Sequence, residues 1–323
     1  MLAPATSTFR PHPLLRGGHF QTLAGVYLPG RRFVYKARQH RVTLDDGDQI
    51  VLHDDCPAGW QPGDRVALLI HGLAGCHQSP YMPRVAARLE ARGVRAFRMD
   101  LRGCGAGVGL ARLPYHGGRS EDAAAALETI ARLCPGSPAA LVGFSMGGNI
   151  ALKLLGELGE ERCGHLDRAV AVCPPFDLLA AVRHVHRPAN RLYERHFVRL
   201  LVAQVRQRER NLPDAPTVRF GRLPRSLWEF DDLFTAPVCG FGRADDYYRL
   251  SSAARVAENI RRPALVIAAQ DDPLVPAAPL ERLRDCPSVE LEITRHGGHL
   301  GYVGWREGDH RWLDERIVGW LTS

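Results

Sequence analysis

One stretch of the sequence indicates the fold most clearly: Leu141-Val142-Gly143-Phe144-Ser145-Met146-Gly147-Gly148-Asn149. Pro138-Ala139-Ala140 precede it and extend an apolar, uncharged segment that predicts a short strand. Ile150-Ala151-Leu152-Lys153-Leu154-Leu155 follow it with the spacing of a helix packed on a sheet. A strand, Gly-x-Ser-x-Gly and a helix in this order predict a tight turn that presents the Ser145 hydroxyl as a nucleophile.

The glycines of this stretch suit such a turn. A serine between a strand and a helix adopts a strained backbone conformation, so its neighbours must lack bulk, and Gly143, Gly147 and Gly148 provide that room. The helix N-terminus below the hydroxyl favours negative charge that develops during a reaction. The alternative is a chance match in a chain with 32 glycines, and the flanking strand and helix argue against it.

Composition indicates a globular protein with a full core: 323 residues, 45% hydrophobic and 24% charged. The net charge of +7 comes almost entirely from arginine, since only Lys36 and Lys153 are lysine. No arginine run alternates with aromatic residues, so we expect no nucleic-acid partner. An anionic substrate and a peripheral membrane contact both stay open.

Cysteine usage and the N-terminus predict a cytoplasmic protein. The eight cysteines are scattered without a C-x-x-C pair and are expected to be reduced. The first sixteen residues contain no apolar core of a signal peptide. No stretch approaches the roughly 18 apolar residues of a membrane span.

Strands alternate with helices along most of the chain. Apolar strands are expected at 65–70, 94–100, 168–173, 264–269 and 289–294, with a hairpin over 41–53. This alternation predicts an α/β fold with a mostly parallel sheet flanked by helices. It pauses between residues 176 and 262, where a helix is expected over 190–210. We therefore predict a core of residues 1–175 and 263–323, with an N-terminal arm over 1–40, and an inserted helical cap over 176–262.

Two loops after later strands contain the partners that a nucleophilic serine needs. Asp271 and Asp272 follow one strand, and His296 and His299 follow the next. Serine, acid and histidine in this chain order can converge at the carboxyl edge of a parallel sheet. We prefer Asp272 because it directly precedes Pro-Leu-Val-Pro, and His299 because it lies on the more flexible part of its loop. In this arrangement His299 takes the serine proton, and Asp272 orients the imidazole.

The loop His71-Gly72-Leu73-Ala74-Gly75 follows the first buried strand. Its small residues suit backbone N–H groups that bind an oxyanion, and the expected donors are the N–H groups of Leu73 and Met146. His71 is expected to hold the loop in place rather than to react.

Several other residues are candidates for which a structural role is the better hypothesis. His19 is expected to fix the N-terminal arm, and Cys104 to pack. His184 and His186 lack a third metal ligand, so we expect them in the packing of the cap. The H-x4-D match at His40 and Asp45 is taken as chance. Aromatic residues of the insertion suggest a site for apolar acyl groups: Phe176, Trp228, Phe230, Phe234 and Phe241.

The chain resembles the YheT-like α/β-hydrolases, a family that includes plant embryo-specific proteins and ABHD lipases. The motifs that carry the resemblance span most of the chain: Gly18-His19-Phe20-Gln21-Thr22, residues 71–75, Arg102-Gly103-Cys104, Tyr115-His116-Gly117-Gly118, residues 143–149, residues 245–249, Asp271-Asp272-Pro273 and residues 296–301. The resemblance implies an α/β-hydrolase fold, a triad of Ser145, Asp272 and His299, and esterase or lipase activity without metal or cofactor. His53-Asp54-Asp55 depart from the Asp-Trp expected in relatives, which concerns the packing of an early strand.

These observations together predict a serine hydrolase that cleaves carboxylic esters, with medium-chain or lipid-type acyl esters as substrates. Two alternatives stay open: an acyltransferase that uses the same acyl-enzyme, and a non-catalytic binding protein with this fold. The sequence does not determine the acyl chain length or the oligomeric state.

Overall fold

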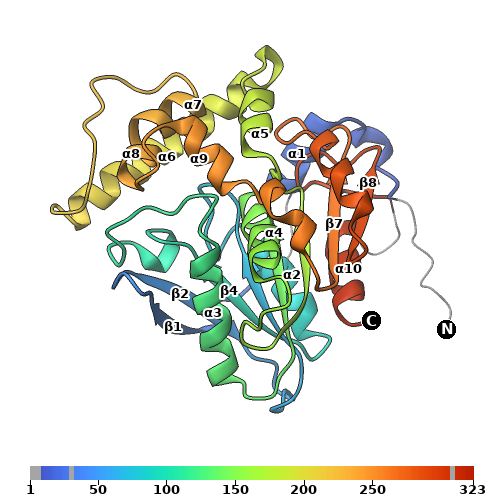
Figure 1. Ribbon diagram of the computed structural model, residues 1–323. Helices are drawn as coiled ribbons and strands as arrows, with labels where there is room; N and C mark the ends of the chain where they lie inside the picture. The colour runs from blue at the N-terminus through green and yellow to red at the C-terminus, as the bar shows by residue number, and fades with distance from the viewer. Residues whose placement is uncertain (1–8, 29–32, 306–309) are drawn as a thin grey trace.

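The described part of the chain contains one eight-stranded sheet, in the order β1-β2-β4-β3-β5-β6-β7-β8 (Figure 1). The computed structural model describes residues 9–28, 33–305 and 310–323. β2 is antiparallel to β1 and β4, and all other neighbouring strands are parallel, so the sheet is mostly parallel, as predicted. The strands are β1 (Arg38–Thr43), β2 (Gln49–Asp55), β3 (Val66–Ile70), β4 (Arg95–Asp100), β5 (Ala139–Phe144), β6 (Leu166–Val172), β7 (Ala264–Ala269) and β8 (Val289–Thr294).

Helices cover both faces of the sheet. Every residue of β3, β5 and β7 is buried, which explains their continuous apolar sequences. One face packs against α2 (Tyr81–Glu90) and α10 (Trp312–Leu321). The other face packs against α3 (Ser120–Leu133) and α4 (Met146–Leu158). β5 lies in the middle of the sheet, so the turn between β5 and α4 is held from both sides.

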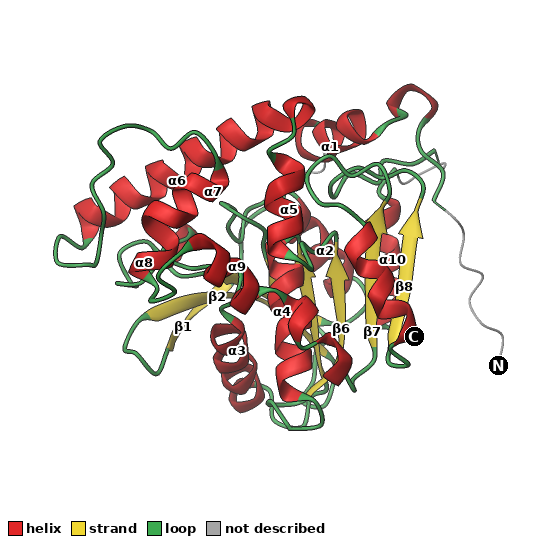
Figure 2. Cartoon of the chain, turned by 45° about the horizontal axis from the view of Figure 1, so that its top comes forward, coloured by secondary structure: helices red, strands yellow, loops and turns green. Residues whose placement is uncertain are grey.

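The chain between β6 and β7 forms helices that lie toward the carboxyl ends of the parallel strands (Figure 2). The predicted helix over 190–210 is confirmed as the long helix α6. The others are short, and η4 is a turn of π-helix. The bounds are α5 (Leu178–Val185), α6 (Arg191–Asn211), α7 (Leu227–Phe230), η4 (Asp231–Thr235), α8 (Ala236–Val238) and α9 (Ala244–Ser251).

The N-terminal arm contains a helix that its hydropathy did not reveal. α1 (Gly18–Tyr27) packs against the loops that follow β7 and β8. A Cβ on Gly18 would lie 1.6 Å from the backbone oxygen of Asp271, so only glycine permits this approach. The Gln21 side chain bonds the backbone of Leu15 and Val303. Residues 1–8 and 29–32 of the predicted arm lie outside the described residues.

All eight cysteines are free thiols, in agreement with the prediction. Among the described residues, no helix is both long enough and apolar enough to cross a bilayer.

Candidate active site

Ser145 lies at the turn between β5 and α4 with a backbone φ of 52°. This left-handed conformation is rare for a residue with a side chain, and close backbone packing maintains it. A Cβ on Gly143 would lie 2.2 Å from the Gly147 oxygen, and one on Gly147 would lie 2.4 Å from the Ile70 oxygen. The glycines are therefore required by the turn, as the sequence indicated.

The three predicted side chains meet at the carboxyl edge of the sheet. Ser145 Oγ lies 2.9 Å from His299 Nε2, and His299 Nδ1 lies 2.8 Å from Asp272 Oδ2. The side chains of His299 and Asp272 are buried. With Nδ1 donating to the carboxylate, Nε2 is left to accept the serine proton, which is the geometry that an activated hydroxyl requires.

The two neighbouring aspartates make different contacts. Asp272 Oδ1 accepts hydrogen bonds from the N–H groups of Leu274 and Val275, at 2.8 and 3.0 Å, which leaves Oδ2 for His299. Asp271 instead accepts a 2.9 Å hydrogen bond from the Gly298 N–H. Asp271 thus ties the histidine loop to the end of β7 without touching His299.

α1 contributes to the placement of the histidine. The His299 N–H donates a 2.9 Å hydrogen bond to Thr22 Oγ1. Gly298 adopts a φ of 55°, and a Cβ there would lie 2.3 Å from the Gly18 oxygen. α1 therefore positions a side chain that is 277 residues further along the chain from Thr22, a contact that sequence reasoning missed.

Of the two residues predicted to supply oxyanion donors, Leu73 lies on the loop after β3, and Met146 is the first residue of α4. Neither the Leu73 N–H nor the Met146 N–H donates a hydrogen bond within the described residues. Both residues line the same cavity as Ser145. His71 is fully buried and bonded to the Gly72 oxygen and the Leu101 N–H, in agreement with its predicted structural role. Burial lowers the pKa of His71, so its imidazole is neutral at pH 7.

Two tyrosines hold this loop, and the sequence did not identify them. The Tyr81 hydroxyl accepts from the Gly72 N–H and the Tyr115 hydroxyl from the Ala74 N–H, both at 2.9 Å. Leu73 lies between these two anchors. The Tyr115 hydroxyl in turn donates to Gln204 on α6. No local sequence signal marks such a contact, because the partners are brought together only by the fold.

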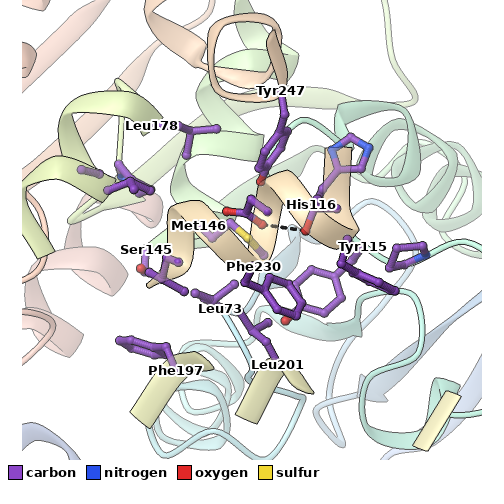
Figure 3. Close-up of a pocket in the computed structure, with 18 of the residues that line it drawn as sticks. Leu73, Tyr115, His116, Ser145, Met146, Leu178, Phe197, Leu201, Phe230 and Tyr247 are labelled. Carbon is purple, nitrogen blue, oxygen red and sulfur yellow. Dashed lines mark hydrogen bonds between the residues drawn. The ribbon is translucent and has the colours of Figure 1, made fainter. Parts of the chain in front are cut away.

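A cavity of about 150 Å³ lies beside Ser145. Figure 3 shows aliphatic and aromatic side chains around it, among them Leu178, Phe197 and Leu201. Its wall also contains polar groups, of which Asp231 accepts hydrogen bonds from Thr235 and Tyr248. Burial raises the pKa of Asp231 to about 6, against the effect of those two hydrogen bonds.

The prediction of aromatic residues at an acyl site is only partly correct. Phe230 and Phe234 line the cavity. Phe176 is instead buried in the core against the sheet, Trp228 is 37% exposed, and Phe241 packs on His116. The inner face of α6 supplies further lining residues, Phe197, Leu201 and Val205. Their i, i+4, i+8 spacing is a signal that could have identified them.

The remaining histidines and cysteine make structural contacts. The ring of His184 lies 3.2 Å from the backbone oxygen of Asp272, and His186 pairs with Glu194. His19 stacks on Tyr193, which joins α1 to α6. His40 pairs with Asp54 on the neighbouring strand, in agreement with a chance H-x4-D match. Burial raises the pKa of the Cys104 thiol well above its usual value, so it is unreactive.

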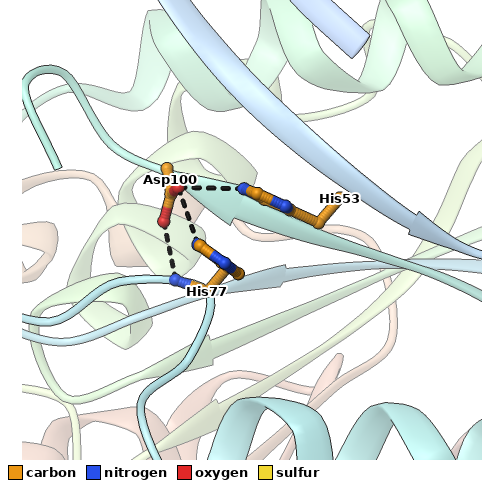
Figure 4. A group of neighbouring side chains, drawn as sticks. All are labelled: His53, His77 and Asp100. Atoms are coloured by element: carbon orange, nitrogen blue, oxygen red, sulfur yellow. Dashed lines mark hydrogen bonds and ion pairs between the residues drawn. The ribbon is translucent and has the colours of Figure 1, made fainter. Parts of the chain in front are cut away.

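Two groups among the described residues bring three metal-ligating side chains together. In the first, His53 and His77 stack and share Asp100 (Figure 4). Burial alone would raise the pKa of Asp100, but hydrogen bonds from both imidazoles outweigh it and lower that pKa. Two backbone N–H groups also donate hydrogen bonds to this carboxylate, so groups of the protein itself satisfy its oxygens. His53 belongs to the segment that departs from the Asp-Trp expected in relatives, and its bond to Asp100 anchors β2 to β4.

The second group is Cys173, Asp272 and His299. Burial and the nearby Asp272 carboxylate raise the pKa of the Cys173 thiol well above its usual value. His299 bonds Asp272 through Nδ1 and Ser145 through Nε2. These hydrogen bonds explain why Asp272 and His299 lie close together.

Comparisons with known proteins agree with this architecture. A family model described as the alpha/beta hydrolase fold matches residues 66–304. YheT of Escherichia coli, provisionally named an esterase, is 34% identical over 310 residues, which cover 94% of this chain and 90% of YheT. The chain is a YheT-like α/β-hydrolase. This confirms the fold and the family that the sequence motifs predicted.

Other relatives extend the comparison. Phospholipase ABHD3 of Mus musculus is 29% identical to the hydrolase over 312 residues, which cover 92% of this chain and 74% of ABHD3. The esterase Pf2001 of Pyrococcus furiosus has a similar structure, with a TM-score of 0.58 over 98% of both chains. Its sequence identity is 15%, so this similarity concerns the fold alone.

Proposed function

We propose that this hydrolase cleaves carboxylic esters through an acyl-enzyme on Ser145. The observation that carries the proposal is the chain of contacts from Ser145 Oγ to His299 Nε2 at 2.9 Å and from His299 Nδ1 to Asp272 at 2.8 Å, beside a largely apolar cavity. The names of the relatives, an esterase and a phospholipase, support the same class of reaction.

In the first half of the reaction, Ser145 Oγ attacks the acyl carbon and passes its proton to His299 Nε2. The N–H groups of Leu73 and Met146 bind the oxyanion of the tetrahedral intermediate. Asp272 holds the Nδ1 proton and stabilises the imidazolium. When the intermediate collapses, the alcohol leaves with the proton from Nε2. In the second half, His299 Nε2 removes a proton from water as the water oxygen attacks the acyl carbon. Collapse of this second intermediate breaks the bond to Ser145 Oγ and releases the acid, and His299 returns the proton to Oγ.

The substrate class that fits the cavity is an ester with an apolar acyl group of medium or long chain. Leu178, Val182, Phe197 and Leu201 are among the residues that line the cavity, and such side chains make dispersion contacts with a hydrocarbon chain but no hydrogen bonds. α5 and α6 supply these residues. We therefore also propose that residues 176–262 serve as the cap of the enzyme, which would bind the acyl chain.

Labelling with a fluorophosphonate probe and a chain-length series of p-nitrophenyl esters test the proposal together. We expect the wild-type protein to react with the probe and to hydrolyse the esters, and Ser145→Ala to do neither. Equal labelling of both proteins, or no hydrolysis by the wild type, would favour a non-catalytic binding protein. Product analysis with added alcohol separates hydrolysis from acyl transfer: a new ester in place of the free acid would contradict the hydrolase assignment.

A further inference from the structure

α1 has its polar and apolar faces reversed relative to an ordinary surface helix. Gln21 and Thr22 are buried, with 0% and 5% of their surface exposed, and they bond the loop that carries His299. Phe20, Val26 and Tyr27 point outward, with 62%, 53% and 74% exposed. A surface helix normally buries its apolar side chains, so the outward face of α1 requires another explanation.

The outer face of α6 carries positive charge. Arg191, Arg195 and Arg199 follow an i, i+4, i+8 spacing and are exposed. None of them has an acidic partner among the described residues. Leu192, 78% exposed, lies on the same helix. The helix contains six arginines and two glutamates, and one of these, Glu194, is buried against His186.

The two faces lie on neighbouring helices. His19 on α1 stacks on Tyr193 on α6, with ring centroids 5.7 Å apart. This places the outward side chains of α1 beside the first turns of α6, and Figure 2 shows the two helices meeting at the top of the molecule. The segment 18–28, which contains α1, has no acidic residue. We call Phe20, Val26, Tyr27 and Leu192 with Arg191, Arg195 and Arg199 the docking face.

We propose that the docking face binds the surface of an anionic lipid bilayer. The apolar side chains of α1 would enter the interface, and the arginines of α6 would contact anionic headgroups. The inner face of α6 lines the cavity beside Ser145, so docking would bring that cavity to the lipid surface. The inference deepens the proposed function, on which it rests, by naming a membrane as the source of the ester.

The positive charge of the docking face favours a lipid surface over a second copy of the chain. A second copy of the chain would bring the same unpaired arginines opposite one another, and like charges across an interface are unfavourable. An anionic bilayer offers negative charge over the full length of α6 together with an apolar layer a few ångströms deeper. The arginines of the docking face would then contact the negative charge, and its apolar side chains would contact the apolar layer.

Co-sedimentation with vesicles tests the proposal, in the Ser145→Ala background so that no lipid is hydrolysed. We expect binding to vesicles of phosphatidylcholine with phosphatidylglycerol, and much weaker binding to phosphatidylcholine alone or in 1 M salt. The pair Phe20→Ser and Val26→Ser, and separately the triple Arg191→Gln, Arg195→Gln and Arg199→Gln, should each weaken binding by roughly tenfold or more.

Matched variants remove the same groups elsewhere on the surface. Leu133→Ser with Leu250→Ser removes exposed apolar side chains from α3 and α9, and Arg38→Gln, Arg41→Gln and Arg162→Gln remove the same charge. These control variants should bind vesicles almost as strongly as the Ser145→Ala parent does. Binding that is absent, or that the control set weakens equally, overturns the proposal. So does a dimer in gel filtration that only the docking-face variants dissociate.

A soluble short-chain ester separates this proposal from the proposed function. With Ser145 present, the docking-face variants should hydrolyse p-nitrophenyl acetate at the wild-type rate, because none of their residues touches Ser145, Asp272 or His299. Hydrolysis without vesicle binding would reject the docking face alone, whereas vesicle binding without any hydrolysis would reject only the esterase.

Discussion

At the scale of single residues, the site depends on which of two neighbouring aspartates faces the imidazole. Asp272 turns toward His299, and Asp271 turns away to bind the Gly298 N–H. The two side chains are adjacent in sequence and identical in chemistry. Only the direction of the backbone after β7 gives them different tasks.

Asp272→Asn should lower kcat for p-nitrophenyl ester hydrolysis by roughly 10⁴-fold, because an amide no longer fixes the histidine tautomer or stabilises the imidazolium. Asp271→Asn keeps an acceptor for the Gly298 N–H and should cost much less. The measurement is steady-state kinetics, with thermal unfolding to show that both variants fold. A larger loss in Asp271→Asn would reverse the assignment.

Tyr115→Phe tests how the oxyanion loop is held. The change removes the acceptor of the Ala74 N–H next to Leu73. Losing one such hydrogen bond costs about 1 kcal/mol, so kcat should fall by about five- to tenfold while KM changes little. Tyr35→Phe removes a hydroxyl that bonds His53 and Gln39 and no residue of the loop, and it serves as the control. An unchanged kcat for Tyr115→Phe would show that the loop does not depend on this anchor.

At the scale of elements, α6 separates two environments. Leu201 is 6% exposed and lines the cavity, whereas its neighbour Leu200 is 37% exposed on the outer side. Two neighbouring residues of α6 thus face different environments, one the cavity and the other the solvent. This allows the two faces to be tested with the same substitution.

Leu201→Trp should fill part of the cavity and lower kcat/KM for a decanoyl ester by roughly tenfold or more, with a smaller effect on an acetyl ester. Leu200→Trp adds the same side chain outside the cavity and should leave the chain-length profile unchanged. The measurement is kcat/KM across the p-nitrophenyl ester series. The acyl site would have to lie elsewhere if both variants gave the wild-type profile.

The π-helical turn η4 contains Asp231, whose pKa burial raises to about 6. A carboxyl group with a raised pKa holds its proton more tightly in the folded state. It therefore lowers the free energy of unfolding as the pH rises from about 4 to 6, and this cost persists at higher pH. π-helical turns often occur at functional sites, and Asp231 lines the cavity.

Asp231→Asn should remove that cost. The free energy of unfolding of the variant, relative to wild type, should be higher at pH 8 than at pH 5, as measured by urea denaturation. The exposed Asp285→Asn provides the control for the loss of one carboxyl group. A pH-independent difference for Asp231→Asn would contradict the raised pKa.

At the scale of the whole molecule, the site joins distant parts of the chain, and several buried histidines support that assembly. Burial lowers the pKa of His53, His71 and His116, so these imidazoles are neutral in the folded protein. Each takes up a proton more readily when unfolded. Their contribution to stability is therefore present above a pH of about 6.5 and is lost as the pH falls.

His116→Gln should show this dependence. His116 accepts a hydrogen bond from the Gly118 N–H, which a glutamine oxygen can replace in part. Between pH 8 and pH 5 the wild type should lose up to about 2 kcal/mol of unfolding free energy that the variant keeps. Urea titrations at the two pH values measure the difference. Replacement of an exposed histidine, His165→Gln, serves as the control.

From the sequence alone one can infer the strand–serine–helix turn, the mostly parallel sheet and the order in which the serine, acid and histidine follow their strands. These features are local, because glycine spacing, continuous apolar runs and loop positions are written in neighbouring residues. Tertiary structure alone decided that α1 holds the His299 loop, that Tyr81 and Tyr115 anchor Leu73, and that α6 rather than Phe176 or Trp228 lines the cavity. Such contacts join residues far apart in the chain. α1 escaped prediction for a further reason: it buries its polar side chains and exposes its apolar ones, so hydropathy could not reveal which face the fold would cover.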